Sequence, residues 1–250
     1  DPFHLEAYGE TTVNYNRDVE IFPVLNTIFE KIYGESPYKS PTDMGVNMAG
    51  NCICDDEACR EASKQEIIRR YFDALNALAK GSTSEKEAQK IELLMNMAGI
   101  TVTDRKVVIK ALERAKETDG PAAALELRDG RIITGKTTNL LGASAALLLN
   151  VLKVLAGIDH ETHIISPESI EPIQKLKVDY LNPRLHTDEV LIALSASAAT
   201  NPQARLALSQ LPELAGCQAH TSVMLSDVDI KIFKKLEVQL TSEAVYEHAL

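Results

Sequence analysis

The sequence lacks tryptophan altogether, holds only four cysteines and has no long uncharged apolar run. Its longest apolar stretch, 143–158, is interrupted by Asn150 and Lys153, so no transmembrane helix is expected. No secretory signal peptide is recognisable, and the cysteines are therefore expected to be free thiols in a cytoplasmic protein. Because the chain opens at Asp1 instead of methionine, we expect a fragment or a processed chain.

Basic residues are also scarce relative to acidic ones. The 26 lysines and arginines, against 36 aspartates and glutamates, leave a formal net charge of −10 at pH 7. An acidic surface is repelled by nucleic acid and by anionic membranes, so neither is expected as a partner. The content of 45% hydrophobic and 25% charged residues excludes a fully disordered chain. The chain is also long enough to bury a core without disulfides or metal.

Three of the cysteines, Cys52, Cys54 and Cys59, are crowded together. Their spacing is not a usual zinc-ligand spacing, and no histidine lies near them. We therefore predict no metal site here.

The first 120 residues show the apolar periodicity of helices. Gly34 and Gly81 stand where two of these helices should stop, and Ser84 followed by Glu87 predicts a capping box. The predicted helices cover 18–33, 55–79, 84–97 and 103–117.

The remainder alternates short β-prone runs with helical patterns, and Asp129-Gly130 between two such runs predicts a hairpin. The fold prediction is therefore an α/β protein. A helical N-terminal part, about 1–120, leads into an α/β part, about 121–250, with a small mixed sheet. The predicted strands cover 122–127, 131–134, 162–166, 219–225 and 238–241. The predicted helices cover 138–156, 167–178, 187–199, 202–211 and 227–236.

Residues 130–137 match G-x-x-x-x-G-K-T, the pattern of a phosphate-binding P-loop. The hairpin context argues against that interpretation, because a strand replaces the loop that should wrap round a phosphate. A weaker anion site at Lys136, Thr137 and Thr138 stays open, since these residues precede a predicted buried helix whose N-terminus favours anions. The alternative is a capped helix start with a solvated lysine.

A polar loop at 36–51 concentrates hydroxyl, amide and charged side chains between prolines and glycines. Its interspersed apolar residues suggest that the loop is packed, and packed polar loops often carry function. Asp43 is the candidate acid/base or metal ligand, and Lys39 is the candidate for binding an anion. The alternative is a surface loop that satisfies its own turns. The candidate substrate-binding residues of this loop are Lys39, Ser40, Thr42, Asn47 and Asn51.

Two further segments offer candidates. The varied polar residues of the opening segment include His4, Tyr8 and Arg17 as substrate-binding candidates, with a frayed terminus as the alternative. Arg184 and His186 stand at the entrance of a predicted helix, where they can bind an anionic group or move a proton. A lone histidine is more often structural, which is the alternative for His186.

The stretches 1–10, 36–51, 170–177 and 182–192 are similar to a bacterial family catalogued as domain of unknown function 1846. Members of that family are about twice this length, and their N-terminal half resembles a nucleotide-binding α/β domain. The resemblance implies that this chain corresponds to the C-terminal half. It also implies that nucleotide phosphates bind mainly to the absent half, and that relatives carry a few more residues between Leu181 and Asn182.

Together these features predict half of a cytoplasmic enzyme that acts on a phosphorylated or carboxylated small molecule. Asp43 and His186 are the candidate catalytic residues. The resemblance allows ATP with magnesium as a cofactor, held mainly by the absent N-terminal half of the same protein. The competing hypothesis is a non-catalytic oligomerisation or scaffold module, in which the apolar helices 140–156 and 187–199 form interfaces of a homo-oligomer.

Overall fold

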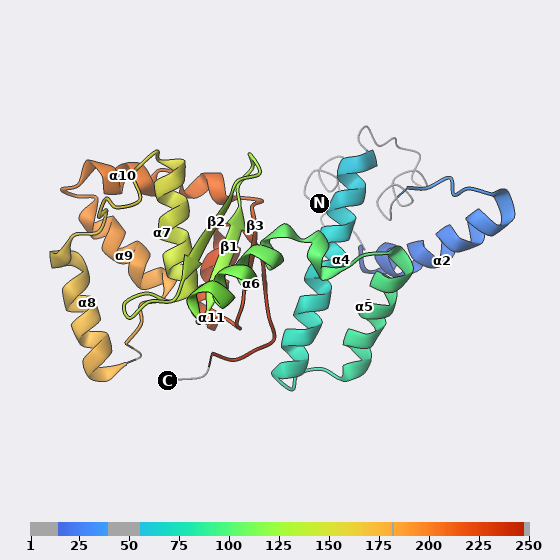
Figure 1. The fold of residues 1–250 in the computed structure, drawn as a ribbon, viewed down its shortest axis with the longest axis horizontal. Helices are drawn as coiled ribbons and strands as arrows, with labels where there is room; N and C mark the ends of the chain where they lie inside the picture. Colours follow the sequence, from blue (N-terminus) through green and yellow to red (C-terminus); the bar gives the residue numbers. More distant parts are fainter. Residues whose placement is uncertain (1–14, 40–55, 182, 248–250) are drawn as a thin grey trace. The chain divides into compact units, whose positions relative to one another are not determined.

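Residues 15–39, 56–181 and 183–247 are described by the structure, a computed structural model (Figure 1). Contacts divide the chain into two units. The first comprises Asp1–Ala74 and Thr83–Asp104, and the second comprises Leu75–Ser82 and Arg105–Leu250. The predicted boundary near 120 rests on composition, which is a different criterion, and it stays a prediction.

The described part of the first unit is helical. It contains α2 (Tyr15–Tyr33), most of α4 (Asp56–Ala79), α5 (Glu85–Ala98) and a short 3-10 helix (Val102–Asp104). The helices predicted over 18–33, 55–79 and 84–97 are therefore confirmed. Gly34 follows α2 with a φ of +82°, a left-handed conformation that glycine adopts without strain.

Two local predictions in this region are wrong. Ser84 does precede α5, but its side chain makes no capping hydrogen bond, so the predicted capping box does not form. The helix predicted over 103–117 is interrupted, because the carboxylate of Asp104 accepts a hydrogen bond from the Thr101 N–H at 2.7 Å and closes a turn. The continuous helix, α6 (Lys106–Thr118), begins only after this turn.

The second unit is built on a four-stranded sheet of described residues in the order β2-β1-β3-β4. Its strands are β1 (Ala122–Glu126), β2 (Ile132–Lys136), β3 (Gln218–Thr221) and β4 (Gln239–Ser242). β1 pairs antiparallel with β2 and β3, and β3 pairs parallel with β4. The mixed sheet and the Asp-Gly hairpin are confirmed, with Gly130 at a φ of +82° in the turn.

Helices cover both faces of this sheet (Figure 1). The side chains of β1 alternate between the faces, as a pleated strand requires. Ala124 packs with Val107 and Ala111 of α6, whereas Leu125 packs in the main core with Leu147 of α7 (Ala143–Leu155). The main core of the unit therefore lies on the α7 side.

The remaining helices form a layer that continues this core. They are α8 (Pro167–Tyr180), α9 (Thr187–Ser197), α10 (Pro202–Leu208), a 3-10 helix (Leu211–Leu214) and α11 (Asp227–Lys235). α9 contacts α7, α8, α10 and α11, and α11 connects the parallel strands β3 and β4. This packing brings the first turn of α9 against the first turn of α11, which are far apart in the sequence.

Some predicted bounds in the second unit need correction. The strand predicted over 162–166 does not form, because Ser166 donates its N–H to the Ser197 hydroxyl at 2.9 Å instead of a neighbouring strand. The third strand ends at Thr221, before the predicted 225, and α10 ends at Leu208, before the predicted 211. The cap of α9 is His186, while Thr187 is its first residue.

The helix predicted from 138 begins at Ala143. The Thr138 hydroxyl accepts hydrogen bonds from the N–H groups of Leu140 and Leu141 at 3.2 and 2.9 Å, which makes a turn. Leu141 then pairs with Leu185 as an isolated parallel bridge. This long-range pairing holds the segment outside the helix.

Gly135 of the P-loop-like pattern lies in β2, in direct contact with α7. A Cβ atom at this position would lie 2.2 Å from the backbone nitrogen of Leu147. Glycine is therefore explained here by the close approach of helix and strand. Among the residues that the structure describes, no helix is both long enough and apolar enough to span a bilayer.

Candidate active site

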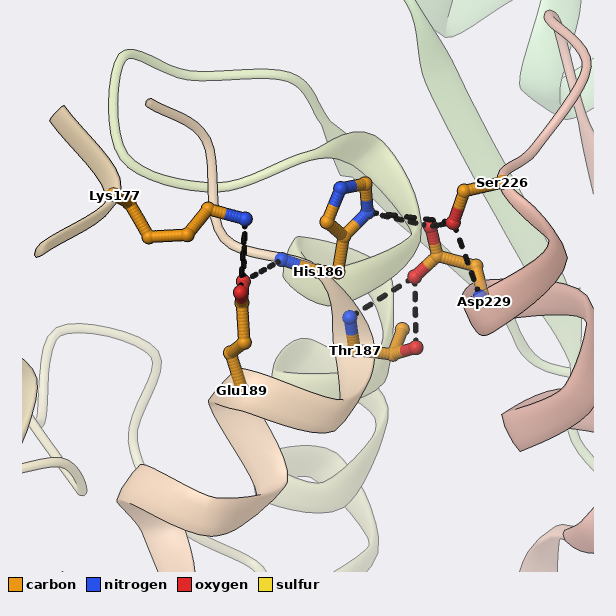
Figure 2. Close-up of polar contacts among 6 residues, drawn as sticks. All are labelled: Lys177, His186, Thr187, Glu189, Ser226 and Asp229. Atoms are coloured by element: carbon orange, nitrogen blue, oxygen red, sulfur yellow. Dashed lines mark hydrogen bonds and ion pairs between the residues drawn. The ribbon is translucent and has the colours of Figure 1, made fainter. Parts of the chain in front are cut away.

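The first turns of α9 and α11 carry a cluster of polar side chains (Figure 2). Helix starts attract such residues because their first N–H groups have no partner within the helix. His186 precedes α9 and Ser226 precedes α11. The Ser226 hydroxyl accepts a hydrogen bond from the Asp229 N–H at 3.2 Å and so caps α11.

Asp229 is the centre of the cluster, and its buried carboxylate is fully hydrogen-bonded. Oδ1 accepts from the N–H and the hydroxyl of Thr187 at 2.9 and 2.7 Å. Oδ2 accepts from the Ser226 hydroxyl at 2.7 Å and lies 2.9 Å from Nδ1 of His186. One carboxylate therefore joins the two helix starts (Figure 2).

The environment of Asp229 keeps it ionised. Burial alone would raise the pKa of this carboxyl, but hydrogen bonds from His186, Thr187 and Ser226 outweigh burial and lower the pKa to about 2. The same hydrogen bond to Asp229 raises the pKa of His186, against the opposing effect of burial. Because a carboxylate only accepts, Nδ1 of His186 carries the proton of this bond.

The other ring nitrogen of His186, Nε2, lies on the far side of the ring from Asp229 (Figure 2). No hydrogen bond to Nε2 comes from any residue that the structure describes. The side chain is 31% exposed, whereas that of Asp229 is 4% exposed. An oriented imidazole therefore presents one nitrogen to solvent or to a ligand.

A second ion pair supports the backbone of His186. Lys177 of α8 is buried and donates to both carboxylate oxygens of Glu189 at 2.9 Å. Glu189 Oε2 also accepts a hydrogen bond from the His186 N–H at 2.8 Å. The histidine is thus held at its main chain by Glu189 and at its ring by Asp229.

Arg184 is the second predicted residue that the structure brings to this place. It lies two residues before His186 and forms an ion pair with Glu247. Both side chains of this pair are partly exposed. Arg184 and His186 both lie at the entrance of α9, and the roles predicted for them stay predictions.

The predicted anion site at 136–138 loses its physical basis. Lys136 is the last residue of β2 and is exposed, and the hydroxyl of Thr138 is used in the turn described above. The hydroxyl of Thr137 is buried without a partner among the described residues. Because α7 begins only at Ala143, these residues do not stand at a helix N-terminus. Anion binding here stays a prediction without the helix to support it.

Most of the other candidates lie outside the described residues. Lys39 is exposed in the segment that follows α2, and Arg17 belongs to α2. The roles predicted for both stay predictions. Within the described ranges, no three histidine, cysteine, aspartate or glutamate side chains are grouped so that they could hold a metal ion. The candidates that lie outside the described residues are His4, Tyr8, Ser40, Thr42, Asp43, Asn47 and Asn51.

Sequence reasoning missed the partners of His186. A local signal for two of them was present, since Ser226-x-x-Asp229 and His186-x-x-Glu189 both resemble capping patterns. Lys177 carries no such signal, because a lysine on a helix is usually solvated. The pairing of His186 with Asp229 depends on how α9 and α11 pack, which no local pattern indicates.

The fold and the site together define an α/β protein in which a buried aspartate pairs with a partly exposed histidine at two adjoining helix starts. The chain belongs to the DUF1846 family. Residues 103–250 match its C-terminal domain, described as "Domain of unknown function DUF1846, C-terminal", and residues 1–99 match the corresponding N-terminal domain. The expectation that the chain resembles only the C-terminal half is thereby corrected. These two matches meet close to the division at Asp104 and Arg105.

Similar proteins occur in several bacteria. A UPF0371 protein of Corynebacterium urealyticum is 58% identical over 249 residues, covering 98% of this chain and 50% of its own length. One of Corynebacterium diphtheriae is 57% identical over 250 residues, covering 99% and 50%. One of Streptococcus thermophilus is 53% identical over 251 residues, covering 99% and 51%. The chain spans about half the length of these curated relatives.

Proposed function

We propose that this chain is one part of an enzyme that acts on a small molecule with a phosphate or carboxylate group. His186 serves as its general acid and base. The observation that carries the proposal is the orientation of the His186 ring by the buried carboxylate of Asp229, with Nε2 left accessible. Proton transfer by histidine needs an oriented ring and one nitrogen within reach of the substrate.

Asp229 supports this role through the tautomer of the ring. A carboxylate that accepts from Nδ1–H leaves Nε2 of the neutral ring as the base, and it stabilises the imidazolium that forms on proton uptake. Thr187 and Ser226 hold the carboxylate by separate hydrogen bonds. The ring is therefore oriented before a substrate arrives, which lowers the cost of reaching the reactive geometry.

Ser226 is a positioning residue in this proposal and is not a nucleophile. Its hydroxyl donates to Asp229 and lies 3.4 Å from Nδ1 of His186, on the carboxylate side of the ring. In a nucleophilic triad the hydroxyl stands at the opposite nitrogen, where the histidine can take its proton. The geometry thus favours proton transfer to or from a substrate over a covalent serine intermediate.

The rest of the active site would come from other parts of the full-length protein. The roles predicted for Asp43 and the polar loop at 36–51 stay predictions. ATP with magnesium stays an expectation that rests on the family resemblance. No step of the proposed proton transfer depends on it.

The test is a thermal-shift screen of phosphorylated and carboxylated metabolites, followed by turnover measurements on each ligand that stabilises the chain. The screen is run on this chain and on a form extended to the length of the relatives. His186→Gln is expected to abolish turnover, and exposed His163→Gln is the matched control that keeps it. Turnover that survives His186→Gln at the wild-type rate contradicts the proposal.

A second function, assembly into a homo-oligomer, is favoured by the outer surface of α8. Leu176 and Tyr180 lie one helical turn apart and are 54% and 78% exposed, and Leu181 follows at 61%. Exposed apolar groups of this kind often mark an interface. The occupant we propose is a second copy of the chain.

Light scattering after size-exclusion chromatography tests this second function. Leu176→Glu with Tyr180→Glu is expected to convert the oligomer into a monomer. Reversing the charge at exposed Glu168, as Glu168→Lys, serves as the control on the same helix. A wild-type chain that is monomeric at high concentration contradicts the assembly function.

A further inference from the structure

Arg184 and His186 flank one buried residue, Leu185, which lies in an isolated parallel bridge with Leu141. Leu185 donates its N–H to the Leu140 carbonyl at 2.8 Å and accepts from the Gly142 N–H at 3.2 Å, and its side chain is fully buried. Successive side chains of extended backbone point to opposite sides. Arg184 and His186 therefore share the outer face, with their Cα atoms about 6–7 Å apart.

Glu247, one partner of Arg184, reaches this face along the segment that leads to Ser226. Glu243 donates its N–H to the Thr221 carbonyl at 2.9 Å, and Met224 donates to the Val245 carbonyl at 2.8 Å. The residues after β4 thus run beside the loop that precedes α11. Glu247, two residues further on, places its carboxylate on the guanidinium of Arg184.

The three ion pairs of this region differ in how firmly they are held. Asp229 and Glu189 are each bound by several donors, and their side chains are 4% and 22% exposed. The pair of Arg184 and Glu247 is more open, with side chains 31% and 36% exposed. Exposed ion pairs contribute little free energy, because water and salt compete for both groups. Glu247 is therefore the carboxylate that an incoming anion can replace most easily.

We propose that Arg184 is the anion-binding residue of this site and that Glu247 occupies it until the phosphate or carboxylate of a ligand takes its place. This inference rests on the proposed function and names its substrate class: small oxyanionic molecules whose reacting proton lies a few atoms from the anionic group. A guanidinium suits this role because its parallel N–H groups bind two oxygens of a carboxylate or phosphate. With this spacing, Arg184 binds the anionic group of the ligand while His186, on the same face, transfers the proton.

The test titrates the 250-residue chain with inorganic phosphate and with acetate at low ionic strength, following the NMR signal of the Arg184 Nε–H group. Glu247→Gln removes the competing charge and keeps the side-chain size. The dissociation constant for phosphate is expected to fall by up to about fivefold, the most that an exposed ion pair is usually worth. The matched control is Glu113→Gln, which breaks the exposed Lys110–Glu113 pair on α6 and should leave the constant unchanged.

Two arginine variants complete the titration, read out from backbone amide signals near position 184. Arg184→Gln is expected to abolish phosphate binding here, and Arg184→Lys is expected to retain weaker binding through its remaining charge. The tighter of the two probes tells whether the ligand presents a phosphate or a carboxylate. The inference is overturned if phosphate binds wild type, Glu247→Gln and Arg184→Gln with the same affinity. It is also overturned if neither phosphate nor acetate binds.

His186→Gln separates this inference from the proposed function. Phosphate affinity should change little in this variant, because Arg184 holds the anion. If the Arg184 and Glu247 variants change phosphate affinity but His186→Gln leaves turnover unchanged, the anion site is supported and the proposed function fails. If His186→Gln abolishes turnover but Arg184→Gln leaves phosphate affinity unchanged, the proposed function is supported and the anion site fails.

Discussion

The carboxylate of Asp229 and the imidazole of His186 meet at 2.9 Å, across two helix starts that are 43 residues apart in the sequence. The contact fixes both the packing of α9 on α11 and the direction of the free ring nitrogen. A single hydrogen bond thus links the stability of the second unit to its proposed chemistry. The first two predictions follow from it.

Replacing Asp229 should be strongly destabilising. Asp229→Asn removes a buried charge that accepts from Thr187, Ser226 and His186, and the amide donates where those groups also donate. We expect a loss of about 2–4 kcal/mol in the free energy of unfolding, measured in urea. Asp227→Asn is the control, since this carboxylate in the same helical turn is 81% exposed. Equal losses of unfolding free energy in the two variants would mean that the hydrogen bonds of Asp229 do not stabilise the fold.

The pH dependence of stability should have two opposite limbs. Because the pKa of Asp229 falls to about 2 on folding, it contributes about 2 kcal/mol above pH 4, and this contribution is lost as the pH falls toward 2. The pKa of His186 is raised, so its contribution is present below the unfolded pKa and is lost as the pH rises through the folded pKa. Unfolding free energies from pH 2 to 9 check both limbs, with Asp229→Asn compared with wild type for the acid limb and His186→Gln for the alkaline limb. A difference between wild type and His186→Gln that does not shrink at alkaline pH contradicts the second.

Gly135 should tolerate no side chain. In Gly135→Ala the new Cβ would lie 2.2 Å from the Leu147 backbone nitrogen, so α7 must move off β2. We expect a loss of at least about 3 kcal/mol, measured by chemical denaturation. Gly142→Ala is the matched control, because its Cβ would lie 3.6 Å from the nearest atom, at ordinary contact distance. A Gly135→Ala protein as stable as Gly142→Ala would contradict the close approach of α7 to β2 as the reason for this glycine.

A second buried network should prove purely structural. Arg105 is 1% exposed and donates to the Thr241 hydroxyl and the Ala219 carbonyl, each at 3.0 Å, from the start of α6. Arg105→Met removes these buried charge-assisted hydrogen bonds, although the Ala219 carbonyl still accepts from the Thr241 hydroxyl at 3.2 Å. We expect a loss of about 2–4 kcal/mol in the free energy of unfolding. Arg128→Met, at a 64% exposed side chain, is the control. An unchanged melting temperature in Arg105→Met contradicts this prediction.

Local sequence patterns are sufficient to predict much of this fold. The periodicity of 18–33, 167–178 and 227–236 corresponds to α2, α8 and α11, and Asp129-Gly130 indicates the hairpin. These features depend on neighbours in the chain. The predicted strand at 162–166 and the helix start at 138 fail because tertiary partners decide those segments. Leu141 pairs with Leu185, which lies 44 residues further along the chain.

In the candidate site, too, local features could be predicted from the sequence and long-range contacts could not. His186 and Arg184 were candidates by residue type and by their place before a helix, and the structure gives each a charged partner. The partners Asp229 and Glu247 were not predicted, because pairing across such separations depends on the packing of helices. A buried lysine such as Lys177 is even harder to predict, since lysine is almost always exposed.

The protonation state of His186, observed by nitrogen NMR across a pH titration, is the most direct test of the proposed chemistry. In the neutral ring Nδ1 should carry the proton and Nε2 should be bare, with a pKa above the ordinary histidine value. Asp229→Asn should lower that pKa. A neutral ring protonated at Nε2, with an ordinary pKa that Asp229→Asn leaves unchanged, would contradict an Asp–His pair prepared for proton transfer.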